Sequence, residues 1–255
     1  MVELTILGTG AWIADAKNKR FGPSVLLKNE GKNILVDAPG GVNYQLAHAG
    51  LLANDIDYIF LTHHHPDHTS GLIQLIGEMY ITRRSAKSPL TIVSPDPERF
   101  LRSILRPYKS TFDSIGKLTN FRINFKKIDN AEKISKIAGI GLKKTAITAH
   151  KLSHSKTNED YGYRFECDGK KIAITGDTAY CEGLIALLSG TDVAICECSH
   201  VQKLPGHLTA YEAKAMSLFT KKLVPYHIYP GWDVKKEFRE FENIYVAKDL
   251  EKIRL

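Results

Sequence analysis

The chain has 255 residues, of which 43% are hydrophobic and 25% charged, and its formal net charge is +7. This length suits one large domain or two small ones, and the balance of apolar and charged residues excludes a disordered chain. No apolar run approaches the roughly 20 residues that cross a bilayer, no secretory signal is visible, and four cysteines are too few for a disulfide framework. We therefore expect a soluble, cytoplasmic protein with no membrane partner.

The predicted elements alternate between strands and helices after a strand-rich start. Strands are predicted at residues 2–8, 23–28, 32–37, 56–62, 90–94, 121–128, 142–152, 161–167, 171–175, 192–198, 223–226 and 244–247. Helices are predicted at residues 41–51, 68–80, 96–108 and 208–220. No linker rich in Pro, Gly or Ser divides the chain, so we expect a single α/β domain over residues 1–255, with two sheets face to face and helices outside.

Positive charge is concentrated in the middle of the chain. Residues 83–151 contain 16 Lys and Arg against 5 Asp and Glu. Such an excess suits an anionic partner, such as a phosphate ester or a nucleic acid. A solvated basic surface is the alternative interpretation, and no KH or RRM fingerprint is present.

A run of histidines follows the predicted strand at residues 56–62. His63 and His65 lie two apart, so their rings project to the same side of an extended backbone. Asp67 and His68 begin the next predicted helix and point inward from another direction. Two groups of imidazole and carboxylate ligands facing one space suit two neighbouring divalent cations. Zn²⁺ fits such ligands, with Mn²⁺ or Fe as alternatives.

The segment FLTHHHPDHTSGL resembles the His-x-His-x-Asp-His motif of the metallo-β-lactamase superfamily. The resemblance implies an αββα four-layer sandwich with a metal site along one edge of its two sheets. It covers nearly the whole chain, because LGTG at residues 7–10, ILVDAPG at residues 34–40 and TGDT at residues 175–178 match further landmarks in order. Asp37, in the second of these loops, would support the ligands from behind rather than bind metal.

The same resemblance supplies the other ligands. Asp177 would bridge both cations, and His227 would complete the second site. His154 would be the third histidine of the first site, with His150 as its competitor four residues upstream. The implied sets are His63, His65, His154 and Asp177 for one cation, and Asp67, His68, Asp177 and His227 for the other.

The segment GHLTAYEA at residues 206–213 resembles a histidine motif of RNase Z and related phosphodiesterases. In that group an additional histidine approaches the scissile phosphate without binding metal, and here it would be His207. Glu197 would orient His207 and keep its imidazole charged. The implied reaction is attack on phosphorus by a hydroxide that bridges the two cations, with Asp67 orienting the nucleophile and His207 stabilising phosphate oxygens or protonating the leaving group.

The substrate is predicted only by class. RNase Z cuts precursor tRNA, and the basic middle segment agrees with RNA, but residues 151–197 leave no room for the long arm that grips tRNA in such proteins. We therefore favour a small phosphodiester, such as a cyclic nucleotide or cyclic phosphate, or a generic nuclease substrate. Candidate phosphate contacts are Arg83, Arg84, Arg102, Arg106 and Lys109. A homodimer is plausible by the resemblance.

Other activities fit the sequence less well. A thioester hydrolase of the glyoxalase II type would use the same ligand set, but its substrate loop lacks the His207 motif. Hydrolysis of β-lactams is disfavoured because no export signal is visible. A binding module without metal is disfavoured because every ligand position is filled.

Overall fold

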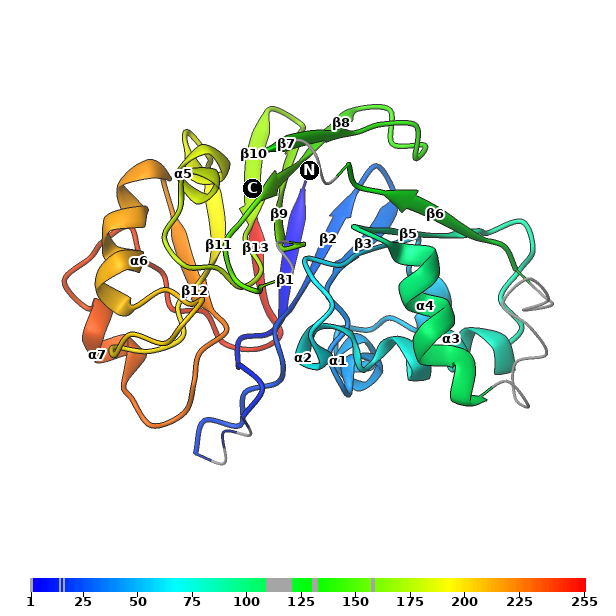
Figure 1. Cartoon of the computed structure of the whole chain (residues 1–255), viewed down its shortest axis with the longest axis horizontal. Coiled ribbons are helices and arrows are strands. Elements are labelled where there is room, and N and C mark those ends of the chain that lie inside the picture. Colours follow the sequence, from blue (N-terminus) through cyan, green and yellow to red (C-terminus); the bar gives the residue numbers. More distant parts are fainter. Residues whose placement is uncertain (1, 14, 16, 109–120, 130–132, 157–158) are drawn as a thin grey trace.

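The computed structural model describes residues 2–13, 15, 17–108, 121–129, 133–156 and 159–255. Two β-sheets lie at the centre of the molecule, with helices α1–α4 on one side and α5–α7 on the other (Figure 1). The seven-stranded sheet has the order β13-β1-β2-β3-β4-β5-β6, and the six-stranded sheet has the order β12-β11-β10-β9-β8-β7. The predicted αββα sandwich is therefore confirmed, while its organisation as a single domain stays a prediction.

The seven-stranded sheet combines the N-terminal half of the chain with the last strand. Its strands are β1 (Glu3–Gly8), β2 (Ser24–Asn29), β3 (Lys32–Val36), β4 (Tyr58–Phe60), β5 (Leu90–Ser94), β6 (Ile123–Lys127) and β13 (Glu251–Arg254). The helices on its side are α1 (Val42–His48), α2 (Pro66–Thr69), α3 (Leu72–Ile81) and α4 (Pro97–Leu105). Strands β3 to β6 run parallel to one another, so their C-terminal ends share one edge.

The six-stranded sheet comes from the second half of the chain. Its strands are β7 (Ile134–Ile137), β8 (Thr145–Lys151), β9 (Tyr161–Cys167), β10 (Lys170–Ile174), β11 (Val193–Glu197) and β12 (Leu223–Tyr226). The helices on its outer face are α5 (Glu182–Leu188), α6 (Ala210–Met216) and α7 (Val234–Phe238). Strands β10, β11 and β12 are parallel, and the loops that follow them lie together.

Apolar side chains fill three layers. Between the sheets, Phe60 meets Tyr163 and Phe165 edge to face, with ring centroids 5.0 and 5.4 Å apart. A second layer lies under α1, α3 and α4, and a third lies under α5, α6 and α7. Helix α3 illustrates the pattern, because its buried residues recur at helical spacing, at Leu72, Leu75, Ile76 and Met79. Each sheet therefore has apolar packing on both faces.

The element predictions were wrong at several places. Residues 244–247 form no strand, and the last strand is β13, which pairs with β1. Its sequence EKIR has a single buried residue, Ile253, so it carries little hydrophobic signal. The predicted helix at residues 68–80 is two helices separated at Gly71, where an added Cβ would lie 2.1 Å from the carbonyl oxygen of Pro39. Strand β7 and helices α5 and α7 were not predicted.

Six loops gather at one edge of the sandwich. They follow β3, β4, β8, β10, β11 and β12. A hydrogen bond from Tyr161 N to Thr62 O (2.9 Å) joins the two sheets there. This edge therefore brings together polar residues that are far apart in the sequence. Among the described residues, none of the helices has both the length and the hydropathy that a bilayer-spanning helix requires.

Candidate metal centre

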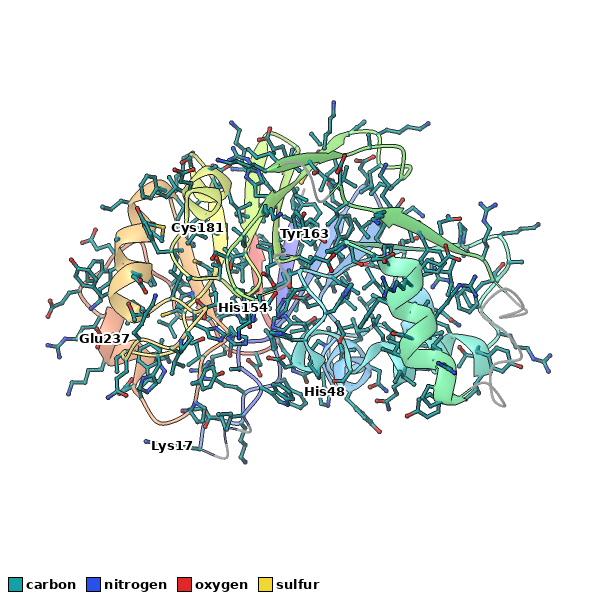
Figure 2. The ribbon with its side chains drawn as sticks, viewed as in Figure 1. Lys17, His48, His154, Tyr163, Cys181 and Glu237 are labelled. Carbon is teal, nitrogen blue, oxygen red and sulfur yellow. The ribbon has the colours of Figure 1, made fainter. Side chains whose placement is uncertain are left out.

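Seven side chains converge at this edge in two groups, and a third set, Glu197, His207 and His227, lies beside the second group and shares His227 with it. The first group is His63, His65, His154 and Asp177, and the second is Asp67, His68, Asp177 and His227. Within each group, the atoms able to bind a cation lie within 4.8 Å of one another. Figure 2 shows His154 near the middle of the molecule, at the junction of the two halves. The structure thus brings together all seven residues that the resemblance implied.

The first group surrounds one oxygen of Asp177. Its Oδ2 lies 3.9 Å from His63 Nε2 and 3.7 Å from His154 Nε2. The same nitrogen of His154 lies 3.0 Å from His65 Nδ1. Ligand atoms that share a tetrahedral cation at about 2.0–2.1 Å are separated by about 3.3 Å from one another. The observed separations are close to that value.

The second group shares the same carboxylate. Asp177 Oδ1 lies 3.2 Å from His68 Nε2, and Asp177 Oδ2 lies 3.1 Å from His227 Nε2. Asp67 Oδ2 lies 3.3 Å from His227 Nε2 and 3.7 Å from His68 Nε2. Asp177 therefore stands between the two groups, where a carboxylate can bridge two cations.

Several atoms of the cluster have no hydrogen-bond partner among the described residues. They are His63 Nε2, His68 Nε2 and Asp177 Oδ1, from side chains that are 2%, 0% and 3% exposed. A buried polar group without a partner costs about 1–3 kcal/mol. Divalent cations would satisfy all three atoms, and a donor set of nitrogen and oxygen without thiolate suits Zn²⁺, Mn²⁺ or Fe. The residues present therefore fit such ions.

Asp37 holds the histidine loop from behind. Its Oδ2 accepts hydrogen bonds from His68 Nδ1 (2.8 Å) and Thr62 Oγ1 (2.9 Å), and its Oδ1 accepts one from Thr62 N (2.8 Å). A carboxylate on the far nitrogen of a ligating histidine fixes the orientation of the ring. Asp37 has a φ of 61° and His227 a φ of 57°, a left-handed conformation that is uncommon for residues with a side chain.

His154 is fixed by a glycine on a distant loop. Its Nδ1 lies 3.0 Å from the carbonyl oxygen of Gly206. Gly206 has a φ of 76°, and an added Cβ would lie 2.6 Å from the carbonyl oxygen of His154. A residue with a side chain at position 206 would therefore displace either His154 or the loop that leads to His207.

A buried hydrogen-bond network lies beside the second group. Glu197 is fully buried at the end of β11, and its Oε1 lies 2.9 Å from His207 Nδ1. Its Oε2 accepts a hydrogen bond from the backbone N–H of Leu208 (2.6 Å). Ser199 Oγ donates to Glu197 Oε1 and lies 3.1 Å from the Nδ1 atoms of both His207 and His227. Glu197 and Ser199 therefore link His207 to a residue of the metal cluster.

Comparison with known proteins identifies the chain. The family model of the anti-Pycsar protein Apyc1 matches residues 2–240. The chain belongs to this family. It is a metal-dependent hydrolase of the metallo-β-lactamase superfamily, in the RNase Z-like branch, as the sequence predicted.

Individual relatives agree with the assignment to the RNase Z-like branch. Ribonuclease Z of Mycolicibacterium gilvum (strain PYR-GCK) is 30% identical over 202 residues, which cover 76% of this chain and 68% of that protein. Ribonuclease Z of Saccharolobus solfataricus is 28% identical over 286 positions, which cover 96% of this chain and 95% of that protein. The crystal structure of human tRNase Z, short form, has a TM-score of 0.77 and 24% identity, and covers 99% and 98% of the two chains. The similarity to human tRNase Z, at 24% identity, supports the fold alone.

Burial determines the charge of the groups beside the cluster. It opposes ionisation of Asp177, but His227 and His68 hold the pKa of that carboxyl well below its usual value. Burial raises the pKa of Glu197 to about 8 and lowers the pKa of His207. These two shifts favour the neutral forms of both side chains, so they do not support the expectation that Glu197 keeps His207 charged. The pair fixes the position of the His207 ring in either protonation state.

The structure separates His154 from its competitor. His150 lies on β8, is 5% exposed, and its Nε2 lies 3.0 Å from Thr148 Oγ1. It belongs to neither group of the cluster. Burial, together with the nearby charge of Arg164, lowers the pKa of His150 to about 4. His150 is therefore a neutral residue of the six-stranded sheet.

Arg84 is not placed to contact a phosphate. Its side chain is 2% exposed and donates to the carbonyl oxygens of Asn54 (2.9 Å) and Ser88 (2.8 Å). Asn54 precedes β4, whereas the histidine loop follows β4, so Arg84 and the neighbouring Arg83 lie toward the opposite edge. Sequence alone could not distinguish this buried guanidinium from an exposed one.

The remaining basic candidates have no contact with the cluster among the residues described. Arg102 is exposed on α4 and is paired with Glu98 at 2.8 Å. Arg106 is exposed in the turn that follows α4. Lys109 lies outside the described residues. Helix α4 does reach the histidine loop through Phe100, whose ring stacks on His64 with centroids 4.0 Å apart.

Sequence reasoning missed two residues of the site. Ser199 has no motif of its own, and its position two residues after Glu197 is the signal that could have found it. Tyr229 follows His227 by two residues, and its ring centroid lies 6.0 Å from that of His207 and 5.9 Å from that of His227. Each lies two residues after a predicted site residue, and in an extended chain residues two apart face the same side.

Proposed function

We propose that the chain is a phosphodiesterase that holds two divalent cations, Zn²⁺ in first place, and acts on small or cyclic nucleotide phosphates. The observation that carries this proposal is the position of His207. Its ring centroid lies 4.8 Å from that of His154 and 5.3 Å from that of His227, so it adjoins both groups of the cluster. A histidine that is held by a buried carboxylate and belongs to neither group is suited to act on the substrate.

The ligand groups would hold one cation each, with Asp177 shared between them. Two cations bound there would make a water molecule acidic enough to act as a nucleophile near neutral pH and would neutralise charge on the phosphate. Asp67 can accept a hydrogen bond from an attacking water molecule. His207, held at Nδ1 by Glu197, can present Nε2 to a phosphate oxygen or to the leaving oxygen.

The length of the chain supports a small substrate. The match to Ribonuclease Z of Saccharolobus solfataricus spans 286 positions, more than the 255 residues of this chain, so that relative carries segments without a counterpart here. Strands β9 and β10 are joined by a turn of only two residues, Asp168 and Gly169. No long arm therefore leaves this hairpin to grip a folded RNA. A homodimer stays a prediction.

The first test compares two substrate classes with the metal-loaded protein. We expect hydrolysis of bis(p-nitrophenyl) phosphate and of a cyclic nucleotide, loss of both activities with a chelator, and recovery on adding Zn²⁺ or Mn²⁺. S-lactoylglutathione should remain intact. Chelator-sensitive activity on the thioester alone would contradict the proposal and favour the glyoxalase II type.

The second test separates small substrates from RNA. The ratio kcat/KM is measured for a cyclic nucleotide and for a precursor tRNA under the same conditions. We expect the higher value for the small substrate. A higher value for the tRNA would retain the phosphodiesterase chemistry and overturn the proposed substrate size.

A further inference from the structure

A second concave feature lies at the opposite end of the six-stranded sheet. A cavity of about 610 Å³ is formed by the end of β7, the loop at residues 138–144, the start of β8 and the turn between β9 and β10. Strand β8 begins at this cavity with Thr145 and ends six residues later, at Lys151, close to His154. At a rise of about 3.3 Å per residue, the cavity lies about 20 Å from the metal centre.

Lysines dominate the charge of this cavity. Five of them line it, and none forms an ion pair with a residue that the structure describes: Lys136, Lys143, Lys144, Lys170 and Lys171. Two carboxylates also line it, but Glu166 is already paired with Arg164 at 2.9 Å, and the other is the exposed Asp168. The cavity, which we call the lysine pocket, therefore has a net positive charge.

The loop that carries two of these lysines is held in place by the other sheet. Glu30 accepts hydrogen bonds from the backbone N–H groups of Lys143 (3.0 Å) and Lys144 (2.9 Å) and from Thr145 Oγ1 (2.6 Å). Tyr58 donates to the carbonyl oxygen of Ile140 at 2.7 Å. Glu30 thus binds the backbone rather than the ammonium groups, so the lysine charges stay available while their loop is positioned.

The remaining lining residues indicate the kind of ligand. Ile137, Leu142 and Ile147 supply apolar surface, and neither an aromatic residue nor an arginine is among the described residues that line the cavity. Single-stranded nucleic acids are usually bound on aromatic platforms with arginine, which this pocket lacks. Lysine is a compact point charge that suits phosphate oxygens, and the volume lies within the range for small ligands.

We propose that the lysine pocket binds a compact polyphosphate, such as pyrophosphate or the phosphate chain of a nucleotide, as an anion site separate from the metal centre. Three of its lysines belong to the basic middle segment of the sequence, and two come from β10. The pocket therefore gives a role to part of the positive charge of residues 83–151, which among the described residues does not contact the metal centre. The proposal does not depend on the reaction performed at the metal centre.

The test is a titration of the metal-loaded protein with pyrophosphate, followed by NMR of backbone amide groups and by calorimetry. We expect shifts at residues 139–145 and 168–171, and metal content measured before and after should be unchanged. The variant K143E/K144E/K170E should bind pyrophosphate at least about tenfold more weakly, because three attractive charges become repulsive. Thermal unfolding of the variant checks that it folds.

A matched control changes three exposed lysines elsewhere, in K87E/K127E/K236E, and should bind within about twofold of the unchanged protein because charges beyond a Debye length are screened. Shifts confined to residues 63–68 would show binding only at the metal centre and would overturn the proposal. So would equal weakening in the two triple variants. Binding of a single-stranded RNA oligonucleotide without binding of pyrophosphate would also overturn it.

Discussion

The two ends of β8 place charged residues in opposite environments. Near His154, imidazoles and carboxylates are buried and contact one another, whereas near Thr145 the lysines lie on β7, on β10 and on the loop before β8, and most are exposed to water. Buried charges interact strongly and are costly to leave unpaired, while exposed charges are screened. A single substitution should therefore have a large effect at the metal centre and a small one at the lysine pocket, where several residues must act together.

The largest effect of a single substitution is expected at Asp177. It serves both ligand groups, so D177N should lose bound metal and lower kcat/KM by more than about 10³-fold. Elemental analysis and hydrolysis of bis(p-nitrophenyl) phosphate measure the two effects. D192N, at a carboxylate paired with Lys221 on the protein surface, is the control and should keep both. An Asp177 variant that retained two metal equivalents would contradict the bridging role.

His207 separates catalysis from metal binding. H207A should reduce kcat by about 10²–10⁴-fold while the metal content stays that of the unchanged protein, because His207 belongs to neither ligand group. H200A, at a histidine outside the cluster, should leave turnover unchanged. If H207A lost metal, His207 would have to be reassigned as a ligand.

Ser199 tests how far the buried network extends. S199A removes a hydroxyl that contacts Glu197, His207 and His227, and we expect activity to fall by about 10–100-fold. The loss should appear mainly in kcat, because the hydroxyl positions rings that act on the bound substrate. S217A removes another buried hydroxyl, one that follows α6 and donates to the carbonyl oxygen of Lys214, and should have no such effect. Equal losses in the two variants would reduce Ser199 to a packing role.

Arg84 and Arg83 extend the comparison to neighbouring residues. R84A leaves buried carbonyl oxygens without their donor, so the free energy of unfolding should fall by about 1–3 kcal/mol. R83A removes an exposed side chain and should change it by no more than about 0.5 kcal/mol. Chemical denaturation measures both variants. Loss of substrate affinity in R83A would restore the predicted phosphate contact.

His150 should have no effect on stability at neutral pH, and its effect should appear only in acid. Burial lowers the pKa of His150 to about 4, whereas in the unfolded chain the pKa is about 6.5. The unfolded state therefore takes up the proton first, so this residue lowers stability as the pH falls from about 6.5 toward 4. H150Q should flatten that part of the stability profile and keep its metal. Loss of metal in H150Q, with metal retained in H154Q, would reverse their assignment.

The fold was predictable where the sequence had strong local patterns. Buried strands such as Tyr161–Cys167 were predicted with their observed bounds. Strand β13 was missed because a strand with one buried residue in four resembles a loop. The break in the helix at residues 68–80 was missed because it depends on the close approach of Gly71 to Pro39, a contact from another part of the chain.

The site was predictable to the extent that its residues lie in motifs. The histidine loop, Asp177, His207 and His227 each stand in a short segment with a recognisable pattern, and the structure brings them together. The predicted phosphate contacts were chosen by charge alone, and charge does not reveal that Arg84 faces backbone carbonyls. Ser199 was missed because two of its partners, His207 and His227, lie on later loops, and its only local signal is its position two residues after Glu197.

The single proton of the Ser199 hydroxyl constrains two rings at once. Because that proton is donated to Glu197, the oxygen can only accept from His207 and His227, so both rings carry their hydrogen on Nδ1. Both rings therefore direct Nε2 away from the network: that of His227 offers its lone pair within the ligand group, as a metal ligand needs, and that of His207 is free to take up and donate a proton. A hydroxyl with no reactive role can in this way orient both a ligand imidazole and a neighbouring imidazole that exchanges protons.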